Sequence, residues 1–220
     1  MKVFLYCEGE TERWYFEWLQ NKINHDNRTK EQIKFVFKKA GPSSFAKSNR
    51  DTYTKGMLAN DLYGIIQDIE DYSQENIAKF NKLLKSCKEA EKLLKKIQFI
   101  IGYSNFCFEV WIIAHRIQVK SMSDRNQYYR QINKAYGTTF TSNGEYKRKK
   151  DFNSILAQIT LDDVINRALP ECKRFKTHNY ECNSHLIRTQ YGFTYILNNP
   201  DTTLNVFVEK LLTLAGIITA

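Results

Sequence analysis

The sequence lacks an apolar run that could cross a membrane, because none approaches the roughly 18 residues that a spanning helix needs. We also expect no signal peptide, because acidic residues from Glu8 onward occupy the place of its apolar core. Five cysteines are an odd number for disulfides, and free thiols suit a reducing compartment. No internal repeat or low-complexity linker is present. We therefore expect a cytoplasmic protein that does not associate with membranes.

Acidic residues are fewer than basic ones. The 220 residues include 33 Lys and Arg against 24 Asp and Glu, which gives a net charge of +9 at pH 7. A surplus of this size favours polyanionic partners, and nucleic acid is the commonest of them. A protein that binds no polyanion can be equally basic, so charge alone does not show whether this protein binds nucleic acid. An acidic site on a basic body would suit a metal-dependent enzyme that acts on phosphates.

Such an acidic site is suggested near the N-terminus. The apolar residues 3–6 predict a first strand, and Glu8, Glu10 and Glu12 follow it directly. Gly9 lets the backbone turn tightly between this strand and the helix predicted behind it. The carboxyl ends of the strands form the ligand-binding edge in α/β proteins. Carboxylates clustered there are candidate ligands of a hard divalent cation.

A second strand ends in the same way. Residues 62–67 predict a buried strand, and Asp68, Glu70 and Asp71 come directly after it. Asp68 and Glu70 alternate, so they point to one side of an extended chain. If this strand is the parallel neighbour of residues 3–6, the two acidic ends converge. A solvated turn is the alternative explanation for an acidic pair of this kind.

The order of the apolar patterns predicts an α/β fold. We expect a parallel sheet of about four strands flanked by helices in residues 1–120, with a mostly helical extension, residues 121–220, packed on it as one folding unit. The other predicted elements are a helix capped by Thr11 and ending near Asn24, a strand at 33–37, a surface helix at 45–58, a long helix at 80–94, a strand at 97–101, helices at 124–136 and from Thr160 to Leu169, a turn at 143–144 and a closing helix at 204–217.

Residues 104–115 form a third group of interest. Ser104 or Asn105 can cap a short helix that is almost wholly apolar and should be buried. Glu109 in its first turn either interacts with the helix dipole or points back to the acidic strand ends. We expect His115, further along this helix, to be a packed side chain rather than a ligand.

Two basic features could contact nucleic acid. The run Lys147, Arg148, Lys149 and Lys150 predicts phosphate contact, or else a solvated loop. A lysine face on the long helix leaves the same alternatives open. This face comprises Lys82, Lys85, Lys88, Lys92 and Lys96.

A group of residues in the C-terminal part has the side chains that zinc prefers. The group comprises Cys172, His178, Cys182 and His185. Their spacing, C-x5-H-x3-C-x2-H, matches no ordinary zinc module. We therefore expect scattered side chains here rather than a structural Zn²⁺ site.

Several stretches together resemble a known family. Residues 3–12 resemble the first motif of Toprim domains, and residues 68–71 resemble their D-x-D motif. Residues 104–111, S-N-F-C-F-E-V-W, are similar to the S-N-P-C-F-E-L-W stretch of RloB-like proteins, with Phe106 in place of Pro. Residues 199–203 and the helix after them also suit that family. The resemblance spans most of the chain, and the stretch at 104–111 is its most specific part.

RloB-like proteins are a Toprim-like family of bacterial restriction and abortive-infection loci, often found beside an ATPase of the AAA or ABC type. The resemblance implies a Toprim-like parallel sheet, Mg²⁺ or Mn²⁺ as cofactor, and cleavage or joining of phosphodiesters. By position it implies Glu8 as ligand or general base, and Asp68 and Glu70 as the metal-binding pair. It implies Glu12 as ligand of a second metal. Glu70 departs from the second Asp of the motif, and Asp71 could substitute for it.

We therefore expect a Mg²⁺-dependent nuclease that cleaves DNA, RNA or tRNA in anti-phage defence. One alternative is a non-catalytic module that binds nucleic acid or the ATPase partner, and another is a nucleotidyl or phosphoryl transferase with the same metals. A homo-oligomer is also left open. The expected catalytic residues are Glu8, Asp68, Glu70 and Lys147, the metal ligands Glu8, Glu12, Asp68, Glu70 and Asp71, the nucleic-acid contacts Lys147, Arg148, Lys149 and Lys150, and the supporting residues Ser104, Asn105 and Glu109.

Overall fold

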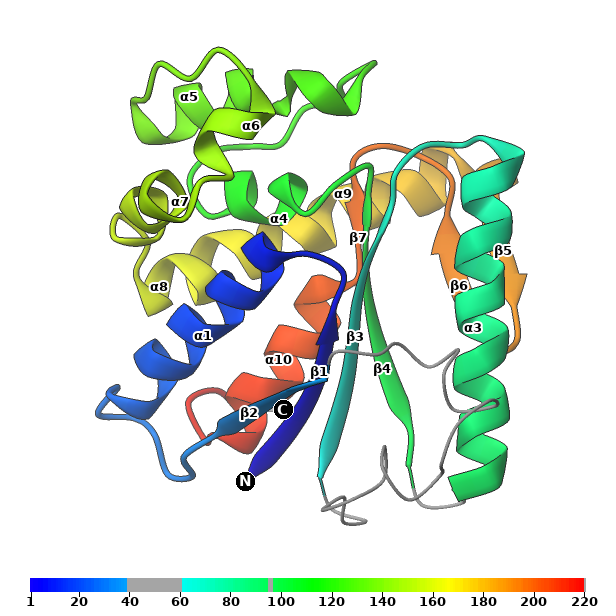
Figure 1. The fold of residues 1–220 in the computed structure, drawn as a ribbon, viewed down its shortest axis with the longest axis horizontal. Coiled ribbons are helices and arrows are strands. Elements are labelled where there is room, and N and C mark those ends of the chain that lie inside the picture. The colour runs from blue at the N-terminus through cyan, green and yellow to red at the C-terminus, as the bar shows by residue number, and fades with distance from the viewer. Residues whose placement is uncertain (39–60, 95–96, 220) are drawn as a thin grey trace.

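A five-stranded sheet forms the centre of the molecule (Figure 1). The computed structural model describes residues 1–38, 61–94 and 97–219. The strands lie in the order β2-β1-β3-β4-β7, and all but β7 are parallel. The predicted α/β class with a parallel sheet is therefore confirmed. The strands are β1 (Lys2–Cys7), β2 (Lys34–Lys38), β3 (Leu62–Ile69), β4 (Phe99–Asn105) and β7 (Asp201–Thr202).

Side chains of β1 alternate between two apolar cores on opposite faces of the sheet. Val3 packs in the core that includes α1 (Glu10–Asn24) and α10 (Leu204–Leu214). Phe4 packs in the other core, under α3 (Gln74–Leu94). Figure 1 shows α1 and α10 on one side of the sheet and α3 on the other. Burial on both faces explains why these parallel strands are almost continuously apolar.

A hairpin that the sequence analysis did not predict lies beside α3 (Figure 1). It consists of β5 (Ile187–Gln190) and β6 (Phe193–Ile196). Tyr195 packs against Phe80 of α3, with ring centroids 5.2 Å apart. Because β5 is largely exposed, its sequence has little of the apolar pattern that marks a strand.

The C-terminal part is mostly helical, as predicted, and it packs against α1. Trp14 of α1 lies over Phe152, with ring centroids 6.1 Å apart. Tyr15 contacts Phe108 and Trp111 within a core that also contains β1 residues. The helices between β4 and β5 are α4 (Glu109–Ala114), α5 (Tyr128–Tyr136), α6 (Asn143–Tyr146), α7 (Lys149–Leu156), α8 (Leu161–Asp163) and α9 (Leu169–Cys182), with 3₁₀ turns at Arg125–Gln127 and Ser184–Leu186 and a π turn at Val164–Ala168.

Two strands extend further than predicted. β3 continues through Asp68 and β4 through Ser104, because these residues face each other in the parallel register. Ile69 and Asn105 form the next pair. The prediction that Ser104 or Asn105 caps α4 is therefore wrong, and the N-cap is Phe108. Pairing between distant strands outweighs the local capping preference of Ser and Asn.

Two local predictions near helix starts are also wrong. Gly9, with an extended backbone, is the N-cap of α1, and Thr11 lies inside the helix with its hydroxyl bonded to Glu12. Residues 143–144 begin α6 instead of forming a turn. The helix predicted at 45–58 falls outside the described residues.

The helix predicted to open at Thr160 is longer than expected. It begins at Thr160 as predicted, and Thr160 forms a capping box with Asp163. The helical chain then continues past Leu169 to Cys182. Pro170 does not end it, because proline is tolerated in the first turn of a helix, where its missing N–H has no partner.

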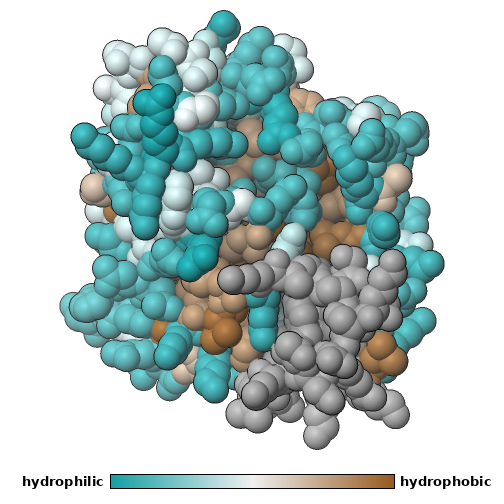
Figure 2. Space-filling model, in the orientation of Figure 1, coloured by the Kyte–Doolittle hydropathy of each residue, from teal (hydrophilic) through white to brown (hydrophobic). Residues whose placement is uncertain are grey.

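Polar side chains cover most of the face seen in Figure 2, and apolar atoms show mainly toward its middle. Of the helices that the structure describes, none is both long and apolar enough to span a bilayer.

A buried polar network ties β7 and α9 to β4. The Tyr103 hydroxyl donates a hydrogen bond to Asp201, and the Asn179 amide donates to the Pro200 carbonyl at 2.9 Å. Asp201 has no exposed surface. Burial raises the pKa of Asp201 from 3.8 to about 7, although the Tyr103 hydroxyl and the charge of Lys176 oppose the increase. This carboxyl therefore destabilises the fold when it loses its proton.

Replacing Asp201 by Asn should remove part of the pH dependence of stability. Because the pKa is higher in the folded state, the folded protein binds a proton that the unfolded chain has released, and stability falls as pH rises through 7. Between about pH 5 and about pH 8, the free energy of unfolding in urea should fall by about 2–3 kcal/mol less for Asp201→Asn than for the wild type. If the stability of both proteins depends equally on pH, the pKa of Asp201 is not raised in the folded protein.

Candidate active site

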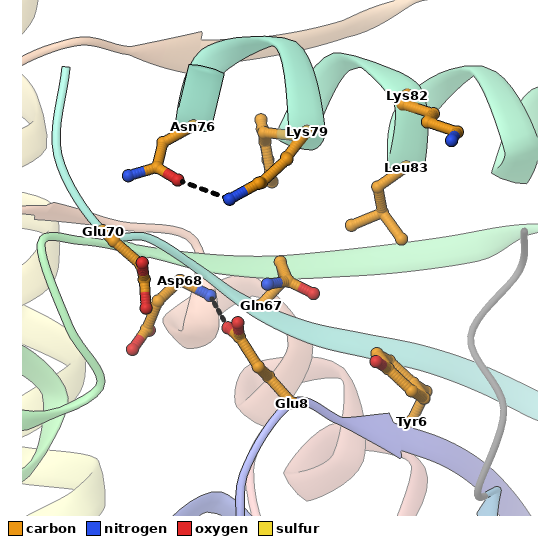
Figure 3. Close-up of a pocket in the computed structure, with 10 residues that line it drawn as sticks. Tyr6, Glu8, Gln67, Asp68, Glu70, Asn76, Lys79, Lys82 and Leu83 are labelled. Atoms are coloured by element: carbon orange, nitrogen blue, oxygen red, sulfur yellow. Dashed lines mark hydrogen bonds between the residues drawn. The ribbon is translucent and has the colours of Figure 1, made fainter. Parts of the chain in front are cut away.

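Glu8 and Asp68 lie side by side at the carboxyl ends of β1 and β3. The strands are parallel neighbours, with Cys7 opposite Ile66. The Glu8 backbone N–H donates to the Ile66 carbonyl at 3.1 Å, and the Asp68 backbone N–H donates to Glu8 Oε2 at 3.0 Å. Figure 3 shows the two side chains at the same edge of the sheet. The structure thus brings the two acidic strand ends together.

The Asp68 carboxylate also binds the start of α4. The Phe108 backbone N–H donates to Asp68 Oδ2 at 3.1 Å. Asp68 therefore accepts a helix-terminal N–H of the kind that a local cap would otherwise satisfy. Ser104 and Asn105 form hydrogen bonds to β7 and to the loop before it, and they do not line the acidic cavity.

Glu12 and Glu109 place two more carboxyl groups close to Asp68. They are 6% and 2% exposed, and both interact electrostatically with Asp68. Glu109 Oε1 forms an ion pair with Lys147 Nζ at 3.2 Å. Of the two alternatives for Glu109, the structure therefore shows the one in which it joins the acids. A Cβ at residue 9 would lie 2.6 Å from Glu12 Oε2, so a larger residue there would displace the end of the Glu12 side chain.

Repulsion between these acids adds to the effect of burial on their pKa values. Burial, followed by the charges of Glu12, Glu8 and Glu109, raises the pKa of Asp68 well above its usual value, although part of Asp68 remains open to the cavity. Burial and the Glu109 charge raise the pKa of Glu12 to about 7. Burial also acts to raise the pKa of Glu109, but the Lys147 charge and hydrogen bonds outweigh it and the pKa is lowered. Burial and mutual repulsion therefore disfavour the ionised forms of Glu12 and Asp68, and a bound cation would favour them.

A cavity of about 270 Å³ opens beside Glu8, and Glu12, Asp68 and Lys147 help to line it. Glu70 also lines this cavity and forms an ion pair with Arg125 at 2.5 Å. The Asp71 carboxylate instead accepts a hydrogen bond from the backbone N–H two residues further on, just before α3. Asp71 therefore lies apart from the other predicted ligands.

The predicted basic run divides between the site and the surface. Lys147 faces the acids; burial lowers its pKa, but the Glu109 charge outweighs burial and the net shift is upward. Arg148, Lys149 and Lys150 are exposed at the start of α7. Their contact with phosphates stays a prediction.

Sequence reasoning missed Arg125 and Tyr146. Arg125 lies in the 3₁₀ turn before α5, and its guanidinium reaches Glu70. The Tyr146 hydroxyl and Glu109 Oε2 are buried without a well-formed hydrogen bond. Neither residue belongs to a local pattern, because each meets the site through tertiary packing. Tyr146 directly precedes the basic run at 147–150, whose charge predicts phosphate contact and says nothing about a tyrosine beside it.

The cysteines and histidines of the C-terminal part are spread over different environments. Cys172 is fully buried, whereas Cys182 and His185 are exposed. His178 Nδ1 lies 3.6 Å from the Cys182 sulfur. His115 is a packed side chain, as predicted, with Nε2 3.1 Å from the Tyr15 hydroxyl.

The acids match a divalent cation in chemistry but do not converge on one point. Carboxylate oxygens are the ligands that Mg²⁺ and Mn²⁺ prefer, and a bound cation would favour the ionised forms that burial and neighbouring acids disfavour. Within residues 1–38, 61–94 and 97–219, no three His, Cys, Asp or Glu side chains are arranged around a common metal position. Binding a cation here therefore requires side chains such as Glu8 and Glu70, which are accessible to solvent, to turn inward.

Comparison with known proteins identifies the family of the chain. The family model described as RloB-like protein matches residues 3–211. No curated protein and no solved structure matches the chain.

Removing Lys147 should destabilise the fold more than removing a neighbouring surface lysine. Lys147→Ala leaves the Glu109 carboxylate buried without its cationic partner, and we expect a loss of about 2 kcal/mol because Lys147 is partly exposed. Lys149→Ala, the matched control, should change stability by less than about 0.5 kcal/mol. Urea unfolding measures both.

Glu109→Gln should rescue part of the loss in the Lys147→Ala background, because the unpaired charge is then absent. A loss in the double variant equal to the sum of the two single losses would show that the pair does not interact.

Proposed function

Because the chain belongs to the RloB-like family, we propose that it is a Toprim-type, divalent-metal-dependent nuclease that cleaves phosphodiesters in nucleic acid. The observation that carries this proposal is the contact between Glu8 and Asp68 across β1 and β3, next to the buried acids Glu12 and Glu109. We further propose that it acts in the cytoplasm in bacterial anti-phage defence, together with an ATPase partner, as the family resemblance implies.

Glu8 and Asp68 would hold the metal ion, and Glu12 or Glu70 would complete its ligands. When bound, Mg²⁺ or Mn²⁺ supplies Lewis acidity toward a phosphodiester and lowers the pKa of water. Glu8 is the exposed member of the set, so its alternative role is that of general base at the mouth of the cavity, with Asp68 and Glu12 or Glu70 as the ligands. Asp68 is held in place by the Phe108 N–H, which fixes its position relative to α4.

Two cations next to the acids would act on the phosphate. Lys147 lines the cavity, and its ammonium group would stabilise negative charge that develops on the phosphoryl oxygens. Arg125 lines the same cavity and binds Glu70. If Glu70 turns inward as a ligand, the Arg125 guanidinium is released to contact phosphate, for which its planar group of donors is suited.

A second candidate function is a non-catalytic module that binds nucleic acid or the ATPase partner. The observation that favours it is the lack of a metal-holding group of three among the described side chains. In that case the acids are structural: Glu8 links β1 to β3, Asp68 caps α4, and Glu109 pairs with Lys147.

Cleavage assays test the first candidate. Wild type should cleave at least one of DNA, RNA and tRNA in Mg²⁺ or Mn²⁺ and none in EDTA, with the ATPase partner and ATP included as a separate arm. Glu8→Gln and Asp68→Asn should each lower the rate at least about 100-fold. Glu17→Gln removes an exposed acid of α1 that pairs with Arg13, and it should cleave normally. If the double variant that carries both Glu8→Gln and Asp68→Asn cleaves like wild type, the assignment of these residues to the active site is wrong.

Thermal melting with and without metal separates the two candidates. A cation that binds only the folded protein stabilises it by about 2.7 kcal/mol at a hundredfold excess over Kd. We therefore expect Mg²⁺ or Mn²⁺ to raise the Tm of wild type but not that of the Glu8→Gln, Asp68→Asn double variant. The non-catalytic candidate predicts no metal-dependent shift in either protein.

A further inference from the structure

A groove of about 490 Å³ runs beside the acids between α3 and the ends of β1 and β3. Glu8, Asp68 and Glu70 line both this groove and the acidic cavity, so the two spaces share a wall. The opposite wall is α3, which contributes Lys79 and Lys82 (Figure 3). We name this space the α3 groove.

The two lysines of the α3 groove are available to a ligand. Lys79 pairs with Glu75 at 2.8 Å, but both side chains are largely exposed, so this ion pair is weak and easily exchanged. Lys82 has no ion-pair partner among the described residues. The Lys82 side chain is exposed, as is that of Lys79. The α3 wall therefore offers positive charge directly across from the acids.

The floor of the α3 groove is partly aromatic and apolar. Tyr6 and Gln67 lie on the face of the sheet that α3 covers elsewhere, and Leu83 points toward them from α3 (Figure 3). Neither the Tyr6 hydroxyl nor the Gln67 side-chain amide has a hydrogen-bond partner among the described residues. The polar Gln67 side chain would be poorly placed if a helix buried it, but α3 leaves it accessible at this point.

We infer that the α3 groove binds an unpaired nucleotide next to the scissile phosphodiester, and that the substrate is therefore single-stranded at this point. The inference rests on the proposed nuclease function. Lys79 and Lys82 bind the phosphate of this nucleotide, and its base stacks on Tyr6 within hydrogen-bond reach of Gln67. A volume of about 490 Å³ lies in the range of pockets that take small organic ligands.

The shared wall explains how the nucleic-acid strand would run from the α3 groove to the acids. A strand whose phosphate lies on the α3 lysines has its next phosphate near Glu8 and Asp68, where cleavage would occur. A fully paired duplex presents phosphates to such a groove but keeps its bases stacked, so it cannot use Tyr6.

Fluorescence anisotropy in EDTA tests the inference without requiring catalysis. The probes are labelled oligothymidylate and oligouridylate, which distinguish DNA from RNA, and a blunt DNA duplex. Lys79→Ala combined with Lys82→Ala should weaken binding of the single strands about tenfold and reduce the salt slope by about 0.7, the value for one phosphate contact on a single strand. Lys134→Ala combined with Lys210→Ala removes the same charge from exposed positions outside the groove and should bind like wild type.

A second variant pair tests the stacking position. Tyr6→Leu should weaken binding about tenfold, whereas Tyr6→Phe, which keeps the ring, should bind like wild type. The inference would be overturned by any of three results: no binding of the single strands, equally tight binding of the duplex, or equal losses in the groove and control lysine pairs.

The two proposals can fail separately. Binding through the groove without metal-dependent cleavage would reject only the nuclease proposal. Cleavage that does not change in the groove variants would reject only the inference.

Discussion

The parallel pairing of β1 with β3 is the constraint on which the candidate site depends. It brings the carboxyl ends of both strands to one edge, so the Asp68 N–H meets the Glu8 carboxylate. The Asp68 carboxylate then accepts the Phe108 N–H, which positions α4 and with it Glu109. A slip of one residue in this register would turn Asp68 to the other face of the sheet and separate these groups.

Burying carboxylates is costly, and the fold offsets only part of that cost. Backbone N–H groups, Lys147 and Arg125 each satisfy one acid. The raised pKa values of Glu12 and Asp68 show that burial and neighbouring acids still disfavour their ionised forms. On a protein with a net charge of +9, this acidic edge is an exception, and a function that brings polyanion and cation together accounts for both features.

The two faces of the sheet contribute differently to the site. On one face, α1, α10 and the C-terminal helices bury a continuous core and bring Lys147 to the acids. On the other, α3 covers an aromatic core but leaves Tyr6 and Gln67 accessible at the end nearest Glu8. The acids at the edge are reached from both sides, through the cavity and through the α3 groove.

The sequence alone determined the α/β class, the parallel sheet, the helix that opens at Thr160 and the two acidic strand ends, because these depend on local periodicity and composition. Only the tertiary structure decided that Asp68, and not Ser104 or Asn105, binds the start of α4, and that Lys147 leaves its basic run to pair with Glu109. It also decided that Arg125 reaches Glu70. Each of these contacts joins residues far apart in the chain, and a local pattern carries no information about which distant partner a side chain will meet.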